Sequence, residues 1–388
     1  MQTTAAVMRA LDEPLSIEEI ELDEPRAGEV LIRMAAVGIC GSDRHVLEGH
    51  FPSSTPSVCG HEGAGVVEAV GEGVDSISVG DHVIQTFVGP CGRCNACRRG
   101  KRTFCTAGWS VDGRLPDGTY RMHGSDGVDI GTTLGLGSFS SHTVSPARNC
   151  VVVPGDVDLG HAALVACGVS TGIGSVLNVA RMRPGDSVAV IGVGGVGAAA
   201  IMGAQLGGAG LIVGVDVHDR KRSAAEGFGA SHFVNARETD VADALRELTN
   251  GWGVDCVILT VDRTLPEHYT LALEALAPGG IAVQVGSSTS GLDHLPVSPS
   301  VFTRKQVSFT GTVYGGMDPA LDAAKYLELY RDGRLDLESL ITTTYRLDQI
   351  NDAFDDLAAG HNIRGVIRFD DSDSAPAAES HPSKQRNQ

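Results

Sequence analysis

The sequence predicts an α/β protein with two domains, a β-rich domain followed by a doubly wound parallel sheet. Three observations support this fold class. The chain has 388 residues, which is enough for two cores because domains usually hold about 100 to 200 residues. Its first part alternates apolar and polar residues between turns, as an antiparallel sheet with one wet face does. After Asn149, apolar runs alternate with helical periodicity, which is typical of a parallel sheet.

The composition excludes several classes of function. It is that of a globular protein, with 42% hydrophobic and 20% charged residues. A net charge of −18 argues against nucleic acid or an anionic membrane as a partner, because phosphate binding needs clustered Lys and Arg. We see neither a basic segment before an apolar run at the N-terminus nor an apolar run of about 18 residues, so we expect neither export nor a membrane span. We expect a cytoplasmic protein.

The first candidate site lies between two strand patterns of the β-rich part, in GICGSDRHVLEGHFPSSTPSVCGHEGAG, residues 38–65. Cys40, His61 and Glu62 offer a thiolate, an imidazole and a carboxylate, which are ligand types that bind zinc. The alternative is that Cys40 is a small core residue and His61 an ordinary loop histidine. These residues alone leave both interpretations open.

Three more polar residues in this stretch are catalytic candidates, namely Ser42, Asp43 and His45. They supply a hydroxyl, a carboxylate and a second imidazole. Groups of these kinds can orient a metal ligand and carry a proton to solvent. We therefore expect them to act beside the candidate metal donors.

A second cysteine cluster predicts a structural zinc site. The chain has nine cysteines, and in a long chain without an export signal these indicate metal binding or catalysis more than disulfides. Four of them, within GPCGRCNACRRGKRTFCTAG, are spaced so that they can close a tetrahedron with no open position. They are Cys91, Cys94, Cys97 and Cys105. The alternative, four loose thiols, explains this spacing poorly.

Residues 186–216, DSVAVIGVGGVGAAAIMGAQLGGAGLIVGVD, predict a dinucleotide site. An apolar run leads into a glycine turn, then a helical segment, then a second apolar run that ends at Asp216. The glycines, Gly192, Gly194, Gly195 and Gly197, allow a sharp turn and the approach of a pyrophosphate to the helix N-terminus. Asp216 can accept hydrogen bonds from the hydroxyls of an adenine ribose and would repel a 2′-phosphate. This order of elements predicts dinucleotide binding, and Asp216 favours NAD over NADP.

The strand and helix alternation continues through SHFVNA, VADALRELTN, VDCVILTV, HYTLALEALAPGG and IAVQVGS, and ends with VSFTGTV near Gly311. Two amphipathic helices and a closing strand follow, which we expect to rejoin the first domain. The last segment, 371–388, is polar and lacks apolar periodicity, so we expect it to be disordered.

Taken together, these motifs resemble the zinc-dependent medium-chain alcohol dehydrogenases over about residues 5–369. The motifs are Cys40, GHEGAG with His61 and Glu62, the four-cysteine lobe, ACGVSTGIGS around Cys167, and GVGGVG with Asp216. The resemblance implies a GroES-like catalytic domain (1–168 and 312–370) that carries the lobe at 91–105, and an NAD-binding Rossmann domain (169–311). It further implies an active site between the two domains, two zinc ions per subunit, and a homodimer or homotetramer.

The resemblance also assigns roles that spacing could not. It implies that Cys167 is the third ligand of the catalytic zinc after Cys40 and His61, with Glu62 an occasional ligand. Ser42 and His45 would relay the proton, and Asp43 would orient His61. Further positions match the cofactor site: Thr171 and Val196 behind the nicotinamide ring, Lys221 at the adenosine ribose and Arg364 at the pyrophosphate. Gly41 stands where some relatives carry another phosphate-binding residue.

The implied reaction is the oxidation of a primary or secondary alcohol to an aldehyde or ketone by hydride transfer to NAD. Three alternatives remain open: a non-catalytic binding protein, a thiol-adduct formaldehyde dehydrogenase, and a dye-linked alcohol dehydrogenase with tightly bound NAD. Trp109 stands where glutathione-type relatives carry an anion-binding arginine, which disfavours the glutathione form. Phe87, Trp109 and Phe139 are candidates for the substrate walls, with ordinary core packing as the alternative.

Overall fold

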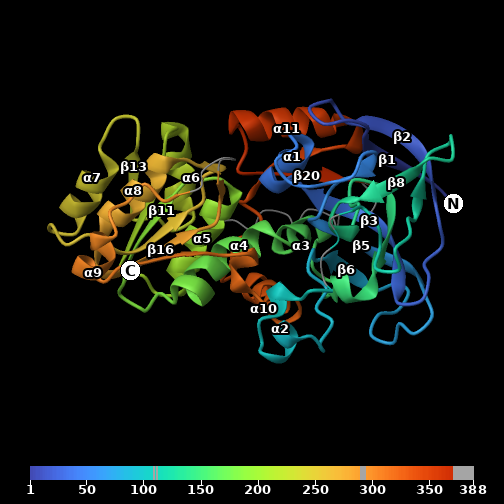
Figure 1. The fold of residues 1–388 in the computed structure, drawn as a ribbon, viewed down its shortest axis with the longest axis horizontal. Helices are drawn as coiled ribbons and strands as arrows, with labels where there is room; N and C mark the ends of the chain where they lie inside the picture. Colours follow the sequence, from blue (N-terminus) through green and yellow to red (C-terminus); the bar gives the residue numbers. More distant parts are fainter. Residues whose placement is uncertain (108–109, 111, 289–293, 370–388) are drawn as a thin grey trace, which may run out of the picture.

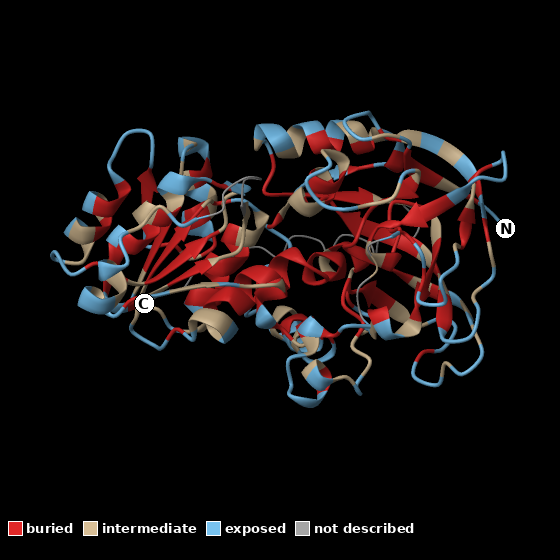
Figure 2. Cartoon of the chain, in the orientation of Figure 1, coloured by how far each residue is buried: buried red, intermediate tan, exposed pale blue. Residues whose placement is uncertain are grey.

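The computed structural model describes residues 1–107, 110, 112–288 and 294–369. Trp109 and the segment 371–388 therefore lie outside the described residues. The described chain forms two halves side by side, with the β-rich half on the right of Figure 1 and the parallel sheet with its helices on the left. In Figure 2 the strands of both halves are largely buried, whereas the outer helices turn exposed faces to solvent.

The β-rich half contains two sheets. A closed barrel joins β1 (Gln2–Met8), β2 (Ser16–Leu22), β7 (Met122–His123), β8 (Asp129–Thr132) and β4 (Ser57–Val58). The second sheet has the order β10 (Cys150–Val152), β6 (His82–Gln85), β5 (Gly63–Val70), β3 (Glu29–Gly38), β20 (Arg364–Arg368) and β19 (Ile341–Tyr345), with β9 (His142–Pro146) on β3. The β1–β2 and β3–β5 pairs are antiparallel, as the alternating pattern predicts.

The other half holds a six-stranded parallel sheet. Its order is β13 (His232–Asn235), β12 (Leu211–Asp216), β11 (Ser187–Ile191), β14 (Val254–Leu259), β16 (Leu276–Gln284) and β18 (Ser308–Gly311). All of its strand pairs are parallel, so the predicted doubly wound sheet is confirmed. The order reverses at β11, whose neighbours are β12 and β14, and such a switch point opens a crevice at the carboxyl ends of the strands.

Helices cover this sheet and connect the halves. Those of the parallel-sheet half are α5 (Gly195–Leu206), α6 (Arg222–Gly227), α7 (Val241–Leu248), α8 (Pro266–Ala275) and α9 (Ser300–Lys305), with the short pair β15 (Arg263–Thr264) and β17 (Ser287–Ser288) nearby. Between the halves run α3 (Leu159–Val165) and α4 (Gly168–Gly174). The chain then returns through α10 (Pro319–Arg331) and α11 (Ile350–Ala359) to β20, which pairs antiparallel with β3.

A buried ion cluster anchors the long loop before β7. The Arg121 side chain is 1% exposed and donates to the Glu29 carboxylate at 2.6 and 2.9 Å and to Asp117 at 2.6 Å. Glu29 begins β3, so the guanidinium fixes the loop to the central strand of the second sheet. A buried charge needs such partners, because desolvation alone would cost several kcal/mol.

Among the described residues, no single helix is long and apolar enough to cross a membrane. One bent pair, α3 with residues 168–180, passes the same test of length and composition when taken together. The first of these helices is almost entirely buried in the core.

Candidate active site

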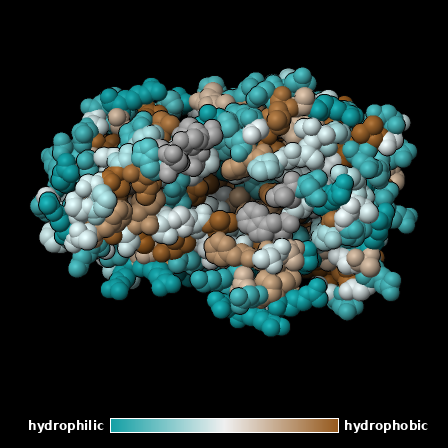
Figure 3. All heavy atoms as spheres, viewed as in Figure 1, coloured by the Kyte–Doolittle hydropathy of each residue, from teal (hydrophilic) through white to brown (hydrophobic). Residues whose placement is uncertain are grey.

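A cavity of about 800 Å³ lies between the two halves. The β-rich half contributes Cys40, His61 and Phe87 to its lining, and the parallel-sheet half contributes Gly192, Asp216 and Thr260. The face in Figure 3 is hollowed between the halves, with brown hydrophobic side chains at the hollow. The first metal candidates and the dinucleotide candidates therefore face the same space.

The structure brings four candidate donors together at this cavity. Cys40, His61, Glu62 and Cys167 are buried, and one ligand atom of each lies within 4.8 Å of the others. Three connections deliver them: the β3–α1 junction, where α1 spans Gly41–Leu47, the β4–β5 loop and the α3–α4 junction. Two thiols, an imidazole and a carboxylate form a set that suits zinc.

His61 is held in one orientation by Asp43. The His61 Nδ1 lies 2.9 Å from Asp43 Oδ1, which leaves Nε2 as the nitrogen available for a metal. Burial raises the pKa of Asp43, although the charge of His61 opposes this. Burial lowers the pKa of His61, but the charges of Asp43 and Cys40 outweigh it and raise that pKa well above its ordinary value. Asp43 therefore lies where the resemblance implies, behind the imidazole.

The two thiols also fit a cation. The Cys167 thiol donates to Cys40, which holds the pKa of Cys40 well below its ordinary value and raises that of Cys167. This hydrogen bond favours the thiolate form of Cys40, and a divalent cation would favour loss of the second proton. A buried pair of thiols next to an imidazole that hydrogen-bonds to one of them is a site that zinc fits.

Glu62 connects this cluster to the glycine turn through Arg364. Burial raises the pKa of Glu62 to about 8, against the lowering effect of the Arg364 charge, and the two side chains form an ion pair. A Cβ at Gly195 would overlap the Arg364 side chain, so Arg364 lies directly on the turn. Its Nε is buried and has no hydrogen-bond partner among the described residues. A donor left over at this point fits an anionic group such as a pyrophosphate.

The glycine turn has the predicted geometry. Gly192 has a φ of 101°, which a residue with a side chain rarely adopts. A Cβ at Gly197 would overlap the carbonyl oxygen of Gly192. The Asp216 carboxylate at the end of β12 accepts the N–H groups of Val193 at 2.8 Å and His218 at 2.9 Å. These bonds fix the carboxylate at the cavity wall, and Gly194, Val196 and Thr171 also line the cavity.

Lys221 lies between the halves as well. Its side chain is buried and donates from Nζ to the backbone oxygen of Asn362 at 2.8 Å. Burial lowers the pKa of Lys221, although the charge of Asp216 raises it. Lys221 and Asp216 both line the cavity. The cavity wall therefore holds an ammonium group and a carboxylate at its cofactor side.

Of the aromatic candidates for the substrate walls, one lines the cavity and another does not. Phe87 lines the cavity, with its ring 6.0 Å from the His61 ring. Phe139 as a substrate wall is wrong: it is fully buried, packs against Phe354 with ring centroids 5.9 Å apart, and belongs to the barrel core. Tyr314, which we did not single out, takes that place instead. It lines the cavity, stacks on Phe87 at 4.2 Å and donates its hydroxyl to the Ala166 oxygen.

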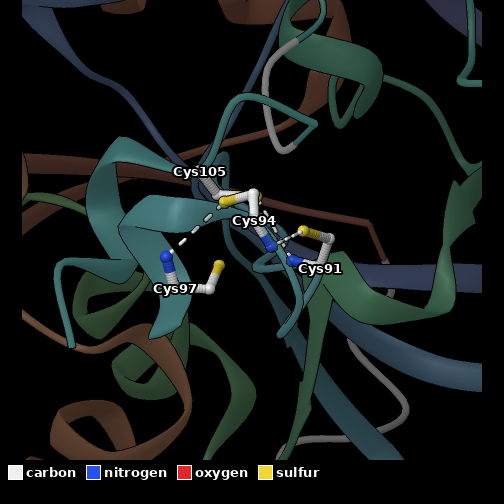
Figure 4. Close-up of side chains that lie close together, drawn as sticks. All are labelled: Cys91, Cys94, Cys97 and Cys105. Atoms are coloured by element: carbon white, nitrogen blue, oxygen red, sulfur yellow. Dashed lines mark hydrogen bonds between the residues drawn. The ribbon is translucent and has the colours of Figure 1, made fainter. Parts of the chain in front are cut away.

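The four lobe cysteines form a separate cluster outside the cavity. Figure 4 shows them gathered around α2 (Asn95–Arg98), and their sulfur atoms lie within 4.8 Å of one another. Backbone N–H groups point at the sulfurs of Cys105, Cys91 and Cys94 at 3.2, 3.4 and 3.5 Å. Such a bond from the Cys97 N–H lowers the pKa of Cys94 to about 6. Backbone hydrogen bonds also lower the pKa of Cys91, whereas burial raises that of Cys97. Four thiols gathered in this way fit a structural zinc.

Two family models match the chain in the places that this geometry indicates. The alcohol dehydrogenase GroES-like domain matches residues 26–155, and the zinc-binding dehydrogenase model matches residues 195–330. The chain belongs to the zinc-dependent alcohol dehydrogenase family. Membership in this family makes it an oxidoreductase, and the match to the zinc-binding dehydrogenase model supports zinc and a nicotinamide cofactor.

Individual members of the family match over nearly the whole chain. Alcohol dehydrogenase B of Mycobacterium tuberculosis is 38% identical and covers 96% of this chain and 100% of its own length. The NDMA-dependent alcohol dehydrogenase of Amycolatopsis methanolica is 38% identical, covering 95% and 99%. A crystal structure of an alcohol dehydrogenase zinc-binding domain protein from Burkholderia ambifaria has a TM-score of 0.90 at 34% identity, covering 95% and 99%.

Proposed function

We propose that this alcohol dehydrogenase family member oxidises small primary or secondary alcohols with NAD, at a catalytic zinc held by Cys40, His61 and Cys167. The observation that carries the proposal is the placement of these three donors on the same cavity as the glycine turn and Asp216. A non-catalytic binding protein would not need a metal donor set that opens onto the cofactor cleft. Glu62, next to the donors and paired with Arg364, serves as an occasional ligand.

Bound zinc supplies a Lewis acid that lowers the pKa of the alcohol hydroxyl, and bound NAD supplies the hydride acceptor. The residues of the chain would orient the metal ligand, accept the proton and exclude water. Asp43 keeps His61 oriented through Nδ1. Ser42 and His45 lie three residues apart on α1, on the same face of the helix, where they can take the hydroxyl proton. Phe87 and Tyr314 form an apolar wall that excludes water.

Other residues would hold the cofactor. Thr171 and Val196 back the nicotinamide ring, and Arg364 binds the pyrophosphate at the turn formed by Gly192, Gly194, Gly195 and Gly197. Asp216 and Lys221 bind the adenosine ribose. The second zinc of each subunit belongs to the four-cysteine lobe. We propose a homodimer or homotetramer in the cytoplasm. The net charge of −18 disfavours nucleic acid and anionic membranes as partners.

Cofactor choice gives a direct prediction. Wild-type enzyme should prefer NAD over NADP by about a hundredfold or more in kcat/KM, because two like charges about 4 Å apart near a protein surface cost about 4 kcal/mol. Asp216→Ser should remove most of this preference. Asp219→Ser is the matched control, because Asp219 is exposed and pairs with Arg222. Initial rates with NAD and with NADP, measured for the wild type and both variants, test this prediction. A wild-type preference for NADP would contradict the assignment of Asp216 to the ribose.

The NDMA-dependent relative favours a second candidate, in which NAD stays bound and electrons pass to an external acceptor. The experiment compares alcohol oxidation with free NAD against oxidation with a nitrosodimethylaniline dye. It also assays for dinucleotide released by denaturing protein that was purified without added cofactor. Cofactor-free protein that turns over on added NAD supports the exchanging dehydrogenase. Dye-linked turnover with dinucleotide released on denaturation supports the second candidate. No alcohol oxidation with either acceptor would overturn both.

A further inference from the structure

Asp262 reaches across the cleft from the parallel-sheet half to α1. It follows β14 and precedes β15. Its Oδ1 lies 3.2 Å from His45 Nε2, and its Oδ2 accepts from Arg44 Nη2 at 2.8 Å. A Cβ at Gly41 would lie 3.2 Å from the same Oδ1, so glycine at this position leaves the carboxylate room. One carboxylate thus holds two neighbouring side chains of the opposite half.

The atoms around His45 Nε2 determine which ring nitrogen carries the hydrogen. Besides Asp262, Nε2 faces the Ser287 hydroxyl oxygen at 3.1 Å. That hydroxyl has a partner for its own hydrogen, the backbone oxygen of Asp262 at 3.2 Å. Both neighbours of Nε2 therefore act as acceptors. A neutral imidazole in this place carries its hydrogen on Nε2 and presents a lone pair on Nδ1.

The other ring nitrogen of His45, Nδ1, is buried but does not take part in a hydrogen bond among the residues that the structure describes. The Glu48 carboxylate lies 3.9 Å away, beyond hydrogen-bond range, and is held by Arg263 at 2.8 Å and His50 at 3.1 Å. The rings of His50 and Phe51 pack edge-on against the imidazole, at 5.6 and 5.5 Å. Nothing described competes with an incoming proton for the Nδ1 lone pair.

Asp262 is charged in this setting. Burial acts to raise its pKa, but the hydrogen bond from His45 and the charge of Arg44 hold that pKa below its ordinary value. An ionised carboxylate stabilises an imidazolium beside it, because the hydrogen bond between them then becomes charge-assisted.

We propose that Asp262 is a positioning residue for His45: it fixes the imidazole with hydrogen on Nε2 and stabilises the imidazolium that forms when His45 takes up the proton of the alcohol. The proposal rests on the proposed function, in which alcohol and NAD give carbonyl product, NADH and one proton. That proton leaves the alcohol oxygen as hydride goes to nicotinamide and ends on Nδ1. Release of this proton from Nδ1 restores the neutral tautomer.

The first test observes the imidazole directly and needs no turnover. Zinc-loaded wild-type enzyme with histidine rings labelled with ¹⁵N is compared with His45→Gln, which identifies the His45 signals by their loss. We expect a protonated Nε2 and an unprotonated Nδ1 in the neutral ring, and a change of this signature in Asp262→Asn. A neutral ring with hydrogen on Nδ1 in the wild type would overturn the proposal.

The second test is the pH profile of kcat/KM between about pH 6 and pH 10. Asp262→Asn should lower kcat/KM about tenfold near pH 7, with the loss shrinking as the pH rises, because hydroxide then accepts the proton instead. Asp262→Glu, which restores the charge, should recover part of the activity. The matched control is Asp243→Asn, because Asp243 belongs to an exposed ion pair with Arg246 on the same half; it should follow the wild-type profile.

Each outcome decides the proposal. A pH-independent loss in Asp262→Asn, or a wild-type profile, would show that Asp262 acts only in packing or not at all. The Asp262 side chain is 46% exposed, so we expect Asp262→Asn to fold. If it does not fold, the protonation of the His45 ring nitrogens in the wild type still tests the proposal. If wild-type enzyme oxidises no alcohol, the proposed function fails, while the ring signature still tests the His45–Asp262 arrangement.

Discussion

Cys40→Ser is expected to lower kcat/KM for alcohol oxidation by about a thousandfold or more while the protein stays folded. The Cys40 sulfur is the donor whose pKa is already lowered, and it lies among the buried candidate ligands. A serine hydroxyl at that place is a far weaker ligand. The lost Lewis acid is worth several kcal/mol of transition-state stabilisation, and about 4 kcal/mol corresponds to a thousandfold.

The matched control is Cys150→Ser. Cys150 is outside both cysteine clusters, and its thiol contacts the Pro146 oxygen at 3.7 Å. It should keep wild-type turnover and zinc content, whereas Cys40→Ser should keep the lobe zinc and lose the other. Initial rates, zinc analysis and thermal unfolding distinguish these cases. Turnover at the wild-type rate in Cys40→Ser would exclude Cys40 as a ligand of the catalytic metal.

Cys94→Ser is expected to act on the fold instead of the chemistry. The four thiolates of the lobe would be held together by the metal. Loss of one ligand should therefore remove the lobe zinc and several kcal/mol of stability. The lobe contacts α10, which lies next to α2 in Figure 1, through the ion pair of Arg102 and Asp318 at 2.9 Å. We therefore expect the mutation to lower solubility and the unfolding temperature as well.

Zinc per subunit and Tm, measured beside the same Cys150→Ser control, test this expectation. The residual folded fraction of Cys94→Ser should retain near wild-type kcat, because the lobe lies outside the cavity. A variant with unchanged lobe zinc and unchanged Tm would contradict a structural role for this cluster.

Much of the fold could be predicted because its signals are local. The apolar runs that become β11 and β12, with the glycine turn between them, specify a strand, a helix and a second strand within about thirty residues. The four lobe cysteines are equally close in sequence. Spacing of this kind can be recognised without knowing the rest of the molecule, so the fold class could be predicted.

The contacts that complete the cleft were not predictable, because they join residues far apart in the chain. Glu62 pairs with Arg364 and His45 with Asp262, over separations of 302 and 217 residues. Phe139 and Tyr314 illustrate the same limit. Each is a large aromatic side chain in a loop-rich segment, and only tertiary packing decides that the first enters the barrel core while the second lines the cavity.

Hydride transfer from an alcohol carbon to NAD in this cavity would carry the hydrogen of that carbon into the reduced cofactor. Zinc-loaded enzyme is supplied with NAD and a primary alcohol that carries two deuterium atoms at its carbinol carbon, and the mass of the reduced cofactor is determined. We predict one deuterium in each NADH formed and an equal amount of aldehyde. Reduced cofactor without deuterium, or aldehyde formed without any reduction of bound or added NAD, would contradict hydride transfer in this cavity.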